Sequence, residues 1–234
     1  LRLMRREITG FSNPLLKEIR GLREKKLRKR AGLFLAEGLR IMTEAREAGF
    51  LPEMLFRVKD RPLHDLEVTL EAEVLDNGGD VIETSADIMA KLSGKDNAQT
   101  VVGVYRDHGT ALGDLDRSTA PIWLVAQSMR DPGNLGTMLR TGDAVGAGGL
   151  VLIDDCTDPF SVESVRASMG AIFTQKIVQC RWEEFTAWLR SGPGQLVGTS
   201  LQTDTDYQAA RYSAPCFILT GNEAQGLPDD YESQ

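Results

Sequence analysis

Apolar residues along this chain recur in short blocks that alternate between the periods of strands and of helices. In the first half, strands are predicted at 33–36, 54–58, 80–83 and 100–105. Helices are predicted at 13–30, where Leu15, Ile19, Leu22 and Leu27 form an imperfect stripe, at 39–48, and from Thr84 or Ser85 to 92. Strands that alternate with helices predict an α/β layer.

The second half repeats the alternation more regularly. Strands are predicted at 122–126, 149–153, 175–178, 195–199 and 216–220, and helices at 134–147, 162–169 and 182–189. This spacing is typical of a parallel sheet covered on both faces. Between the halves, residues 107–121 are polar and have no apolar period. We therefore expect two domains, at 1–108 and 121–234, joined by a linker at 109–120.

Charge is distributed unevenly between the two ends of the chain. The 234 residues carry a net charge of -7, yet residues 1–30 hold 11 Lys or Arg and only three acidic residues. A basic end on an acidic protein can hold a phosphate backbone locally. The candidate phosphate-binding side chains are Arg23, Lys25, Lys26, Arg28, Lys29 and Arg30. A solvated helix face would explain the same charges.

The cysteines and the lengths of the apolar runs indicate the compartment in which the protein works. The three cysteines are far apart in sequence, and no Cys/His cluster has zinc-ligand spacing. Isolated cysteines fit a reducing compartment, and no run reaches the 18 apolar residues of a membrane span. We expect a cytoplasmic protein with no membrane partner and no metal.

Two glycine-rich segments follow predicted strands of the second half. The first runs Asp131-Pro-Gly-Asn-Leu-Gly-Thr-Met-Leu-Arg140-Thr-Gly-Asp-Ala-Val-Gly-Ala-Gly148. Pro132 and Gly133 predict a turn, and Asn134 is suited to cap the helix that follows. Arg140 lies about 160–170° from the apolar face of that helix, which places it toward solvent or another surface. An ordinary surface arginine and a functional one both fit.

The second segment runs Phe217-Ile-Leu-Thr-Gly221-Asn-Glu223-Ala-Gln-Gly226-Leu-Pro. Its strand enters a turn in which Gly221 lets a ligand approach the backbone and Glu223 could hold a ribose, an amide or an arginine. Neither segment carries G-x-G-x-x-G or a Walker A loop. Ligands of parallel sheets bind at the carboxyl ends of the strands, where both segments and Thr199 lie.

Together, in this order and at this spacing, the two segments resemble the first two motifs of the SpoU-type RNA ribose 2'-O-methyltransferases of the SPOUT superfamily. The resemblance extends to Asp158-Pro-Phe160, to Val165-Arg-Ala-Ser-Met-Gly-Ala171 and to Phe34-Leu-Ala-Glu37-Gly. It implies an N-terminal RNA-binding domain similar to the L30e/L7Ae fold and a C-terminal α/β-knot methyltransferase domain. It also implies S-adenosylmethionine as the cofactor, structured RNA as the substrate (ribosomal RNA in preference to transfer RNA), and a homodimer.

The resemblance assigns roles to individual positions. It implies that Arg140 is the arginine at the reacting ribose, that Asn134 is its motif partner, and that Glu223 belongs to the second-motif turn. Gly221 and Leu219 would line the cofactor through backbone atoms, with Thr199 on the neighbouring strand end. An arginine is effectively never deprotonated in proteins, so we expect Arg140 to hold a phosphate and stabilise the developing alkoxide instead of acting as the base.

Two departures stand out. Gly142 occupies a position where the family usually has alanine, which weakens the helix but touches no chemistry. The family's third motif, which completes the cofactor pocket and threads the knot, does not follow Gly226 within these 234 residues. We expect the methyltransferase domain to be C-terminally incomplete here, because a sheet abandoned just after its cofactor turn would be a poor fold. The alternatives are an RNA-binding protein that has lost catalysis and a nucleotide-binding domain that uses the Gly221 turn for phosphates.

Overall fold

A computed structural model of the chain describes residues 4–94, 98–199, 205–222 and 227. Two compact units divide the chain: Leu1–Asp107 with Phe160–Phe173, and His108–Pro159 with Thr174–Gln234. Each unit has one five-stranded sheet, so the expected mixture of strands and helices in two sheets is present. Within the described ranges, no helix is long and apolar enough to cross a membrane.

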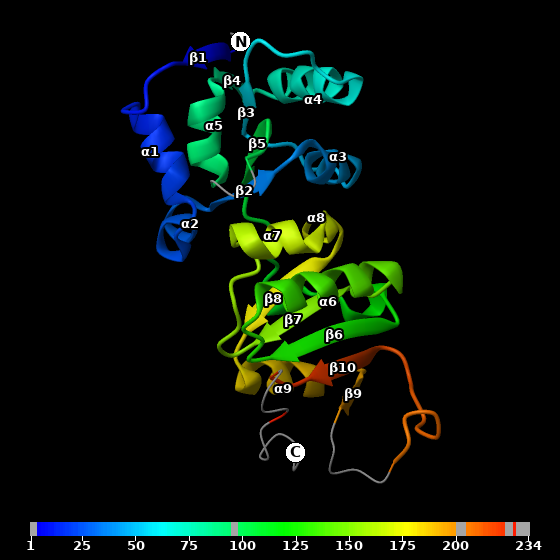
Figure 1. The fold of residues 1–234 in the computed structure, drawn as a ribbon. Coiled ribbons are helices and arrows are strands. Elements are labelled where there is room, and N and C mark those ends of the chain that lie inside the picture. Colours follow the sequence, from blue (N-terminus) through cyan, green and yellow to red (C-terminus); the bar gives the residue numbers. More distant parts are fainter. Residues whose placement is uncertain (1–3, 95–97, 200–204, 223–226, 228–234) are drawn as a thin grey trace. The chain divides into compact units, whose positions relative to one another are not determined.

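The first unit is built on a mixed sheet with the strand order β1-β4-β3-β5-β2 (Figure 1). Its strands are β1 (Met4–Ile8), β2 (Leu33–Glu37), β3 (Met54–Val58), β4 (Asp80–Thr84) and β5 (Val101–Arg106). β1 and β3 pair with β4 in parallel, and β5 pairs with β3 and β2 in antiparallel. The strand β1 was not predicted, because Met-Arg-Arg-Glu-Ile has no apolar alternation.

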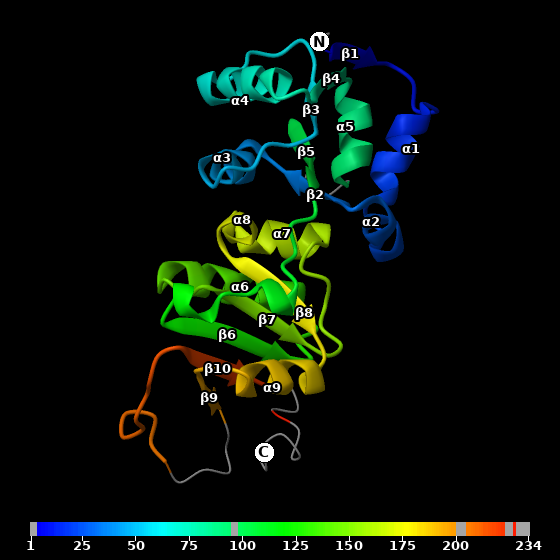
Figure 2. The ribbon, with the colours of Figure 1, turned by 180° about the vertical axis from the view of Figure 1, so that it is seen from behind.

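Helices cover both faces of this sheet (Figure 2). α1 (Pro14–Gly21) and α5 (Ala86–Ser93) pack on one face, while α3 (Leu39–Glu47) and α4 (Asp65–Asp76) cover the other. Asn13 caps α1 and Ser85 caps α5. Side chains of α1 and α5, among them Ile19 and Leu92, pack on Leu35 and Phe56 of the sheet to form one core.

The single helix predicted at 13–30 is wrong, because the chain breaks it after Gly21 and begins α2 at Lys25 (Lys25–Ala31). Arg28 is buried and donates to the carbonyl oxygens of Leu22 and Arg23 at 3.0 and 2.8 Å. A buried guanidinium therefore satisfies the backbone at the corner where α1 stops. The apolar periodicity of the sequence does not reveal this break, because the residue that stabilises the corner is a charged arginine.

The helix α4 was not predicted, because acidic residues share its buried side with apolar ones. It buries Glu67 and Glu71 together with Leu70 and Val74, and exposes Leu66 and Val68. Glu71 pairs with the half-exposed Arg5 of β1 and with the buried Arg57 of β3. Ion pairs therefore add to the apolar contacts of Leu70 and Val74 in holding this helix.

A segment from the second half of the sequence belongs to the first unit. It contains α7 (Val162–Ser168) and α8 (Ala171–Thr174, whose last residue falls in the second unit), and α7 packs on β2. Phe160 and Phe173 lie on either side of it and pack on Phe34 with ring centroids 5.0 and 5.8 Å apart. The first unit is therefore discontinuous in sequence. The segment falls within the range 121–234 that was expected to form the second domain.

The second unit is a parallel sheet with the strand order β8-β7-β6-β10-β9. Its strands, as predicted within a few residues, are β6 (Ile122–Gln127), β7 (Gly149–Ile153), β8 (Lys176–Cys180), β9 (Gln195–Gly198) and β10 (Cys216–Thr220). Trp123 packs with Phe185 of α9 (Trp182–Arg190), whereas Leu124 lies against Gly142 of α6 (Pro132–Ala144). Alternate strand residues point to opposite faces, so the two helices cover opposite faces.

The expected linker is packed on the second unit. It forms two short turns, at Leu112–Asp114 and Arg117–Thr119, and it buries Leu115 in the core. Arg117 donates to the carbonyl oxygens of Trp188 and Leu189 at the end of α9, at 2.5 and 2.9 Å. Leu115 and Arg117 therefore hold this polar segment against the second unit.

Candidate functional site

The two glycine-rich segments meet at the carboxyl edge of the second sheet. β6 and β10 are neighbours, and Ala126 lies opposite Thr220 at their ends. Just beyond, the Asn222 side chain donates to the carbonyl oxygen of Ser128 at 2.8 Å. Ser128 has a left-handed backbone with φ 50°, which turns the chain away from the strand toward α6. This is the sheet edge at which parallel α/β proteins bind ligands.

The residue that caps α6 is Asp131 and not Asn134. Its carboxylate accepts from the backbone N–H of Asn134 at 2.8 Å, and Pro132 occupies the first helical position. The predicted helix start at 134 is two residues late, because both Asp and Asn are good caps. The Asn134 side chain is exposed in the first turn and is free of the capping role.

The side chains of α6 that were predicted to act in the site lie on two different faces of the helix. The Thr220 hydroxyl lies 3.8 Å from the Met138 sulfur, so the Met138 face is turned toward the end of β10. Asn134 lies one turn earlier and about 40° from Met138, at the helix end nearest the strand edge. Arg140 is about 200° from Met138 and is exposed, and no other described residue forms a hydrogen bond or ion pair with its side chain. The helix therefore carries Asn134 to the edge and directs Arg140 away from it.

Three of the predicted cofactor positions lie together at the same edge. The Thr199 N–H donates to the Leu219 carbonyl oxygen at 3.1 Å, and its hydroxyl approaches the same oxygen at 3.4 Å. The Leu219 side chain is buried in the core, so only its backbone could face a ligand. Gly221 follows one residue after β10. Glu223 lies outside the described residues.

A cofactor with a nucleoside and an amino-acid end needs open backbone and neutral polar groups. The Thr199 hydroxyl oxygen can accept a hydrogen bond here, whereas the Asn222 amide is engaged by Ser128 and the Leu227 side chain lies 3.2 Å from where a Cβ of Gly198 would stand. Ser128 and Asn222 were not among the predicted site residues. Asn222 could have been found, since it directly follows Gly221 in the turn.

The thiols near this edge are poor nucleophiles. Burial raises the pKa of Cys156, whose thiol lies 3.3 Å from the Ile153 carbonyl oxygen. Burial, helped by nearby acidic groups, raises the pKa of Cys180 to about 12. Among the described residues, no group of three His, Cys, Asp or Glu side chains is placed to hold a metal.

The basic residues of the first unit divide into two groups. Arg28 is buried at the corner of α1 and α2, and Arg23 donates to the Leu92 carbonyl oxygen at 2.6 Å and to Glu37 at 3.0 Å. The other four candidates are exposed side chains of α2: Lys25, Lys26, Lys29 and Arg30. Position alone therefore separates cations that hold the fold from cations that can meet a ligand.

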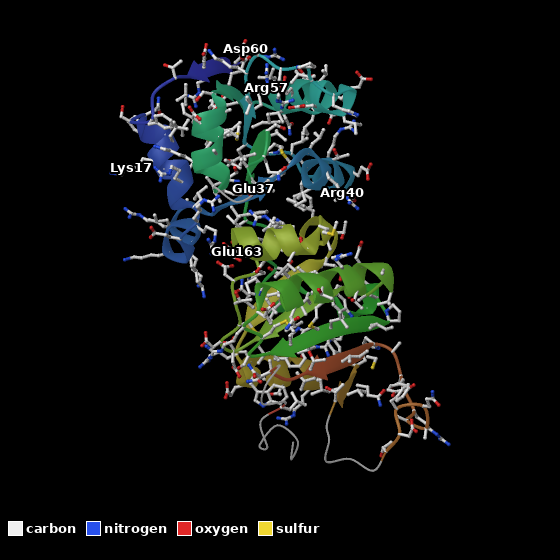
Figure 3. All side chains as sticks on the ribbon, viewed as in Figure 1. Lys17, Glu37, Arg40, Arg57, Asp60 and Glu163 are labelled. Carbon is white, nitrogen blue, oxygen red and sulfur yellow. The ribbon has the colours of Figure 1, made fainter. Side chains whose placement is uncertain are left out.

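Glu37 joins three parts of the first unit, and Figure 3 labels it on β2. Its carboxylate accepts from Arg23 at 3.0 Å and from Arg166 of α7 at 2.6 Å. Burial raises the pKa of Glu37, although Arg166 and Arg23 act to lower it. The family-like Glu37 and Arg166 thus contact each other across 129 residues of sequence.

Comparison with known proteins decides the family. Residues 121–234 match the model of the SpoU rRNA methylase family, and residues 13–103 match the MRM3-like substrate binding domain. The crystal structure of an AdoMet-bound rRNA methyltransferase from Sinorhizobium meliloti superposes with a TM-score of 0.90 at 35% identity, over 98% of this chain and 86% of that one. The chain belongs to the SpoU rRNA methylase family.

Other relatives of the family extend along almost the whole chain. The 23S rRNA (guanosine(2553)-2'-O)-methyltransferase RlmP of Bacillus subtilis is 28% identical over 95% of this chain and 84% of that protein. An uncharacterised tRNA/rRNA methyltransferase of Synechocystis is 30% identical over 94% of this chain and 79% of that protein. The family resemblance of the sequence motifs is confirmed.

Proposed function

We propose that this chain transfers a methyl group from S-adenosylmethionine to a ribose 2'-hydroxyl of ribosomal RNA. The observation that carries this function is the meeting of both family segments at one sheet edge, where Thr220 lies 3.8 Å from Met138 and Asn222 bonds to Ser128 just before the first segment. Relatives named as rRNA 2'-O-methyltransferases and an AdoMet-bound family structure support the reaction and the cofactor. The chain is an RNA ribose 2'-O-methyltransferase.

We assign the cofactor to the carboxyl edge of β6, β9 and β10. Thr199, Gly221 and the backbone of Leu219 would line it, and Glu223 of the second-motif turn is assigned to catalysis by the family resemblance. Bound S-adenosylmethionine supplies an activated methyl group on a sulfonium. The chain's own neutral polar groups at this edge, such as the Thr199 hydroxyl, would orient the ligand, and the buried side chains beneath would exclude water.

We assign Arg140 and Asn134 to the reacting ribose. Transfer requires the hydroxyl oxygen to be aligned with the methyl group and its proton to be removed. A guanidinium stays protonated, so Arg140 holds the adjacent phosphate and stabilises charge that develops on the oxygen. Because Arg140 points away from the edge of its own sheet, it would complete a site with a second subunit or with the RNA. We propose a homodimer in which Arg140 faces the second subunit.

The remaining assignments concern the setting of this reaction. We propose that the first unit is an L30e/L7Ae-like RNA-binding domain, that the methyltransferase domain is knotted, and that the enzyme acts in the cytoplasm without a metal. Lys25, Lys26, Lys29 and Arg30 would bind phosphates, which positions RNA but reads no sequence. Arg23 and Arg28 would support that surface from beneath.

The test is methyl transfer from tritium-labelled S-adenosylmethionine to protein-free ribosomal RNA. Ribose 2'-O-methylation makes the neighbouring phosphodiester resistant to alkali, so label should appear in alkali-stable dinucleotides. Arg140→Ala should abolish that label, whereas Arg190→Ala, an exposed arginine at the end of α9, should retain it. Label that appears only in alkali-labile mononucleotides would overturn ribose methylation in favour of base methylation.

A further inference from the structure

A pocket of about 600 Å³ lies between α1 and α2 of the first unit, far in sequence from the methyltransferase motifs. Its apolar lining comes from Pro14, Leu22, Leu27 and Ala31. Its charged lining comes from Lys17, Glu18 and Arg30, of which Lys17 is labelled on α1 in Figure 3. This volume falls within the range of about 300–1,000 Å³ that is typical of small-molecule sites.

The walls of this pocket are fixed by the corner between the two helices. Arg28 ties α2 to the carbonyl oxygens of Leu22 and Arg23, and Arg23 is itself held by Glu37 and the Leu92 carbonyl oxygen. Gly21 makes the close approach possible, because an added Cβ would lie 2.8 Å from the Leu27 side chain. A pocket whose walls are already ordered loses little entropy when it binds a ligand.

The surface around the pocket is strongly cationic. Residues 14–31 hold eight Lys or Arg and only two acidic residues. The exposed cations are Lys17, Arg20, Lys25, Lys26, Lys29 and Arg30. In the described part of the chain, none of these six side chains forms an ion pair, so their charge is available to an anionic ligand.

We propose that this pocket accepts one unpaired base of the RNA substrate while Lys17 and Arg30 hold the flanking phosphates. A base is flat and largely apolar on its faces, which suits walls of proline, leucine and alanine. Its polar edge can donate an N–H to the Glu18 carboxylate at the rim. The phosphates of an extruded nucleotide lie outside the base, where the cations stand. This inference rests on the proposed function, because it takes RNA as the substrate.

The experiment compares short RNA hairpins of equal length and charge. One is fully paired, and four carry a single bulged A, G, C or U. We expect the wild-type chain to bind at least one bulged hairpin roughly 10-fold more tightly than the paired one, because the apolar pocket removes the faces of the base from water. A 2-aminopurine in that bulge should change its emission when the chain binds. Equal affinity for all five hairpins would overturn the proposal.

Two variants separate the pocket from general phosphate binding. Ala31→Phe fills the pocket and keeps every charge, so it should remove the preference for the bulge and leave the salt dependence unchanged. Lys29→Gln lies on α2 outside the lining, so it should weaken binding to both RNAs equally and retain the preference. Retention of the preference by a folded Ala31→Phe chain would contradict the proposal. If that chain unfolds, Arg30→Gln replaces it, with a reduced preference expected.

Other results identify which idea fails. Displacement of the bulged hairpin by an acidic peptide, with no emission change from 2-aminopurine, would assign the surface to a protein partner and overturn the base pocket. Methyl transfer to ribosomal RNA without any bulge preference refutes the pocket alone. A bulge preference without methyl transfer refutes the proposed function alone.

Discussion

Replacing Glu37 with glutamine tests how the first unit holds its discontinuous segment. The Glu37 side chain is 3% exposed and accepts from Arg23 and Arg166, whose side chains are 31% and 42% exposed. Glutamine keeps the shape, removes the negative charge and directs an N–H₂ group toward a cation. Removing one partner of a fully buried ion pair costs about 3–5 kcal/mol.

The cost here should be smaller, for two reasons. Both arginines are partly exposed and can recover hydration once the carboxylate is gone. Burial also raises the pKa of Glu37 despite both cations, so desolvation already offsets part of the attraction. We therefore expect a loss of about 2 kcal/mol in the free energy of unfolding. For a chain of this size, that corresponds to about 4–8 °C in Tm.

The assay is thermal unfolding followed by calorimetry, with hydrogen exchange across Val162–Ser168 as the local readout. The matched control is Glu73→Gln, whose side chain is 39% exposed against 3% for Glu37 and whose carboxylate lies 2.6 Å from Arg46, and it should lower Tm much less. A double-mutant cycle with Arg166→Gln should recover a coupling between the two sites. A Tm for Glu37→Gln that equals the control, with unchanged exchange in α7, would refute the reasoning.

Three further predictions concern the second unit. Gly142→Ala should lower the free energy of unfolding in urea by about 1 kcal/mol, because the new Cβ would lie 2.9 Å from Gln175 Oε1 and 3.2 Å from Leu124. This overpacking should outweigh the gain in helix propensity. A more stable variant would contradict the prediction. Arg140→Lys should lower methyl transfer at least roughly 10-fold while calorimetry finds the S-adenosylmethionine Kd unchanged, since lysine lacks the bidentate fork; near wild-type turnover would argue against that role. Cys180 should react with iodoacetamide at pH 8 far more slowly in the folded chain than in urea, because its pKa is raised to about 12. The contribution of Cys180 to the free energy of unfolding should fall as the pH rises from about 8.5, the usual pKa of a free thiol, toward that value. Equal rates in the folded and unfolded chain would exclude this burial.

Elements with regular patterns could be predicted from the sequence. The five strands of the second sheet appear within a few residues of their expected bounds, because each is a short apolar run bounded by turn residues. The placement of both glycine-rich segments at carboxyl strand ends follows from the parallel topology. The same topology predicts that Thr199 and Leu219 lie at the same edge, where they form a hydrogen bond.

Charged residues that replace apolar ones in the interior could not be predicted. The buried Arg28 breaks a helix that periodicity would continue, and Glu71 occupies a buried position on α4 where the pattern requires an apolar residue. Both depend on partners distant in sequence, or on a corner that exists only in the folded chain. The capping role of Asp131 was missed for a different reason, because Asn134 satisfies the same local rule.

The two-part makeup of the first unit has a consequence for moving this domain between relatives. A gene fragment for residues 1–107 would leave Phe34 without Phe160 and Phe173, and Glu37 without Arg166. The uncovered aromatic ring and the buried carboxylate would face water, so such a fragment should misfold or aggregate. A transplant that keeps the domain intact has to carry the stretch 160–173 as a second insert, which means that recombination between homologues must exchange both pieces together.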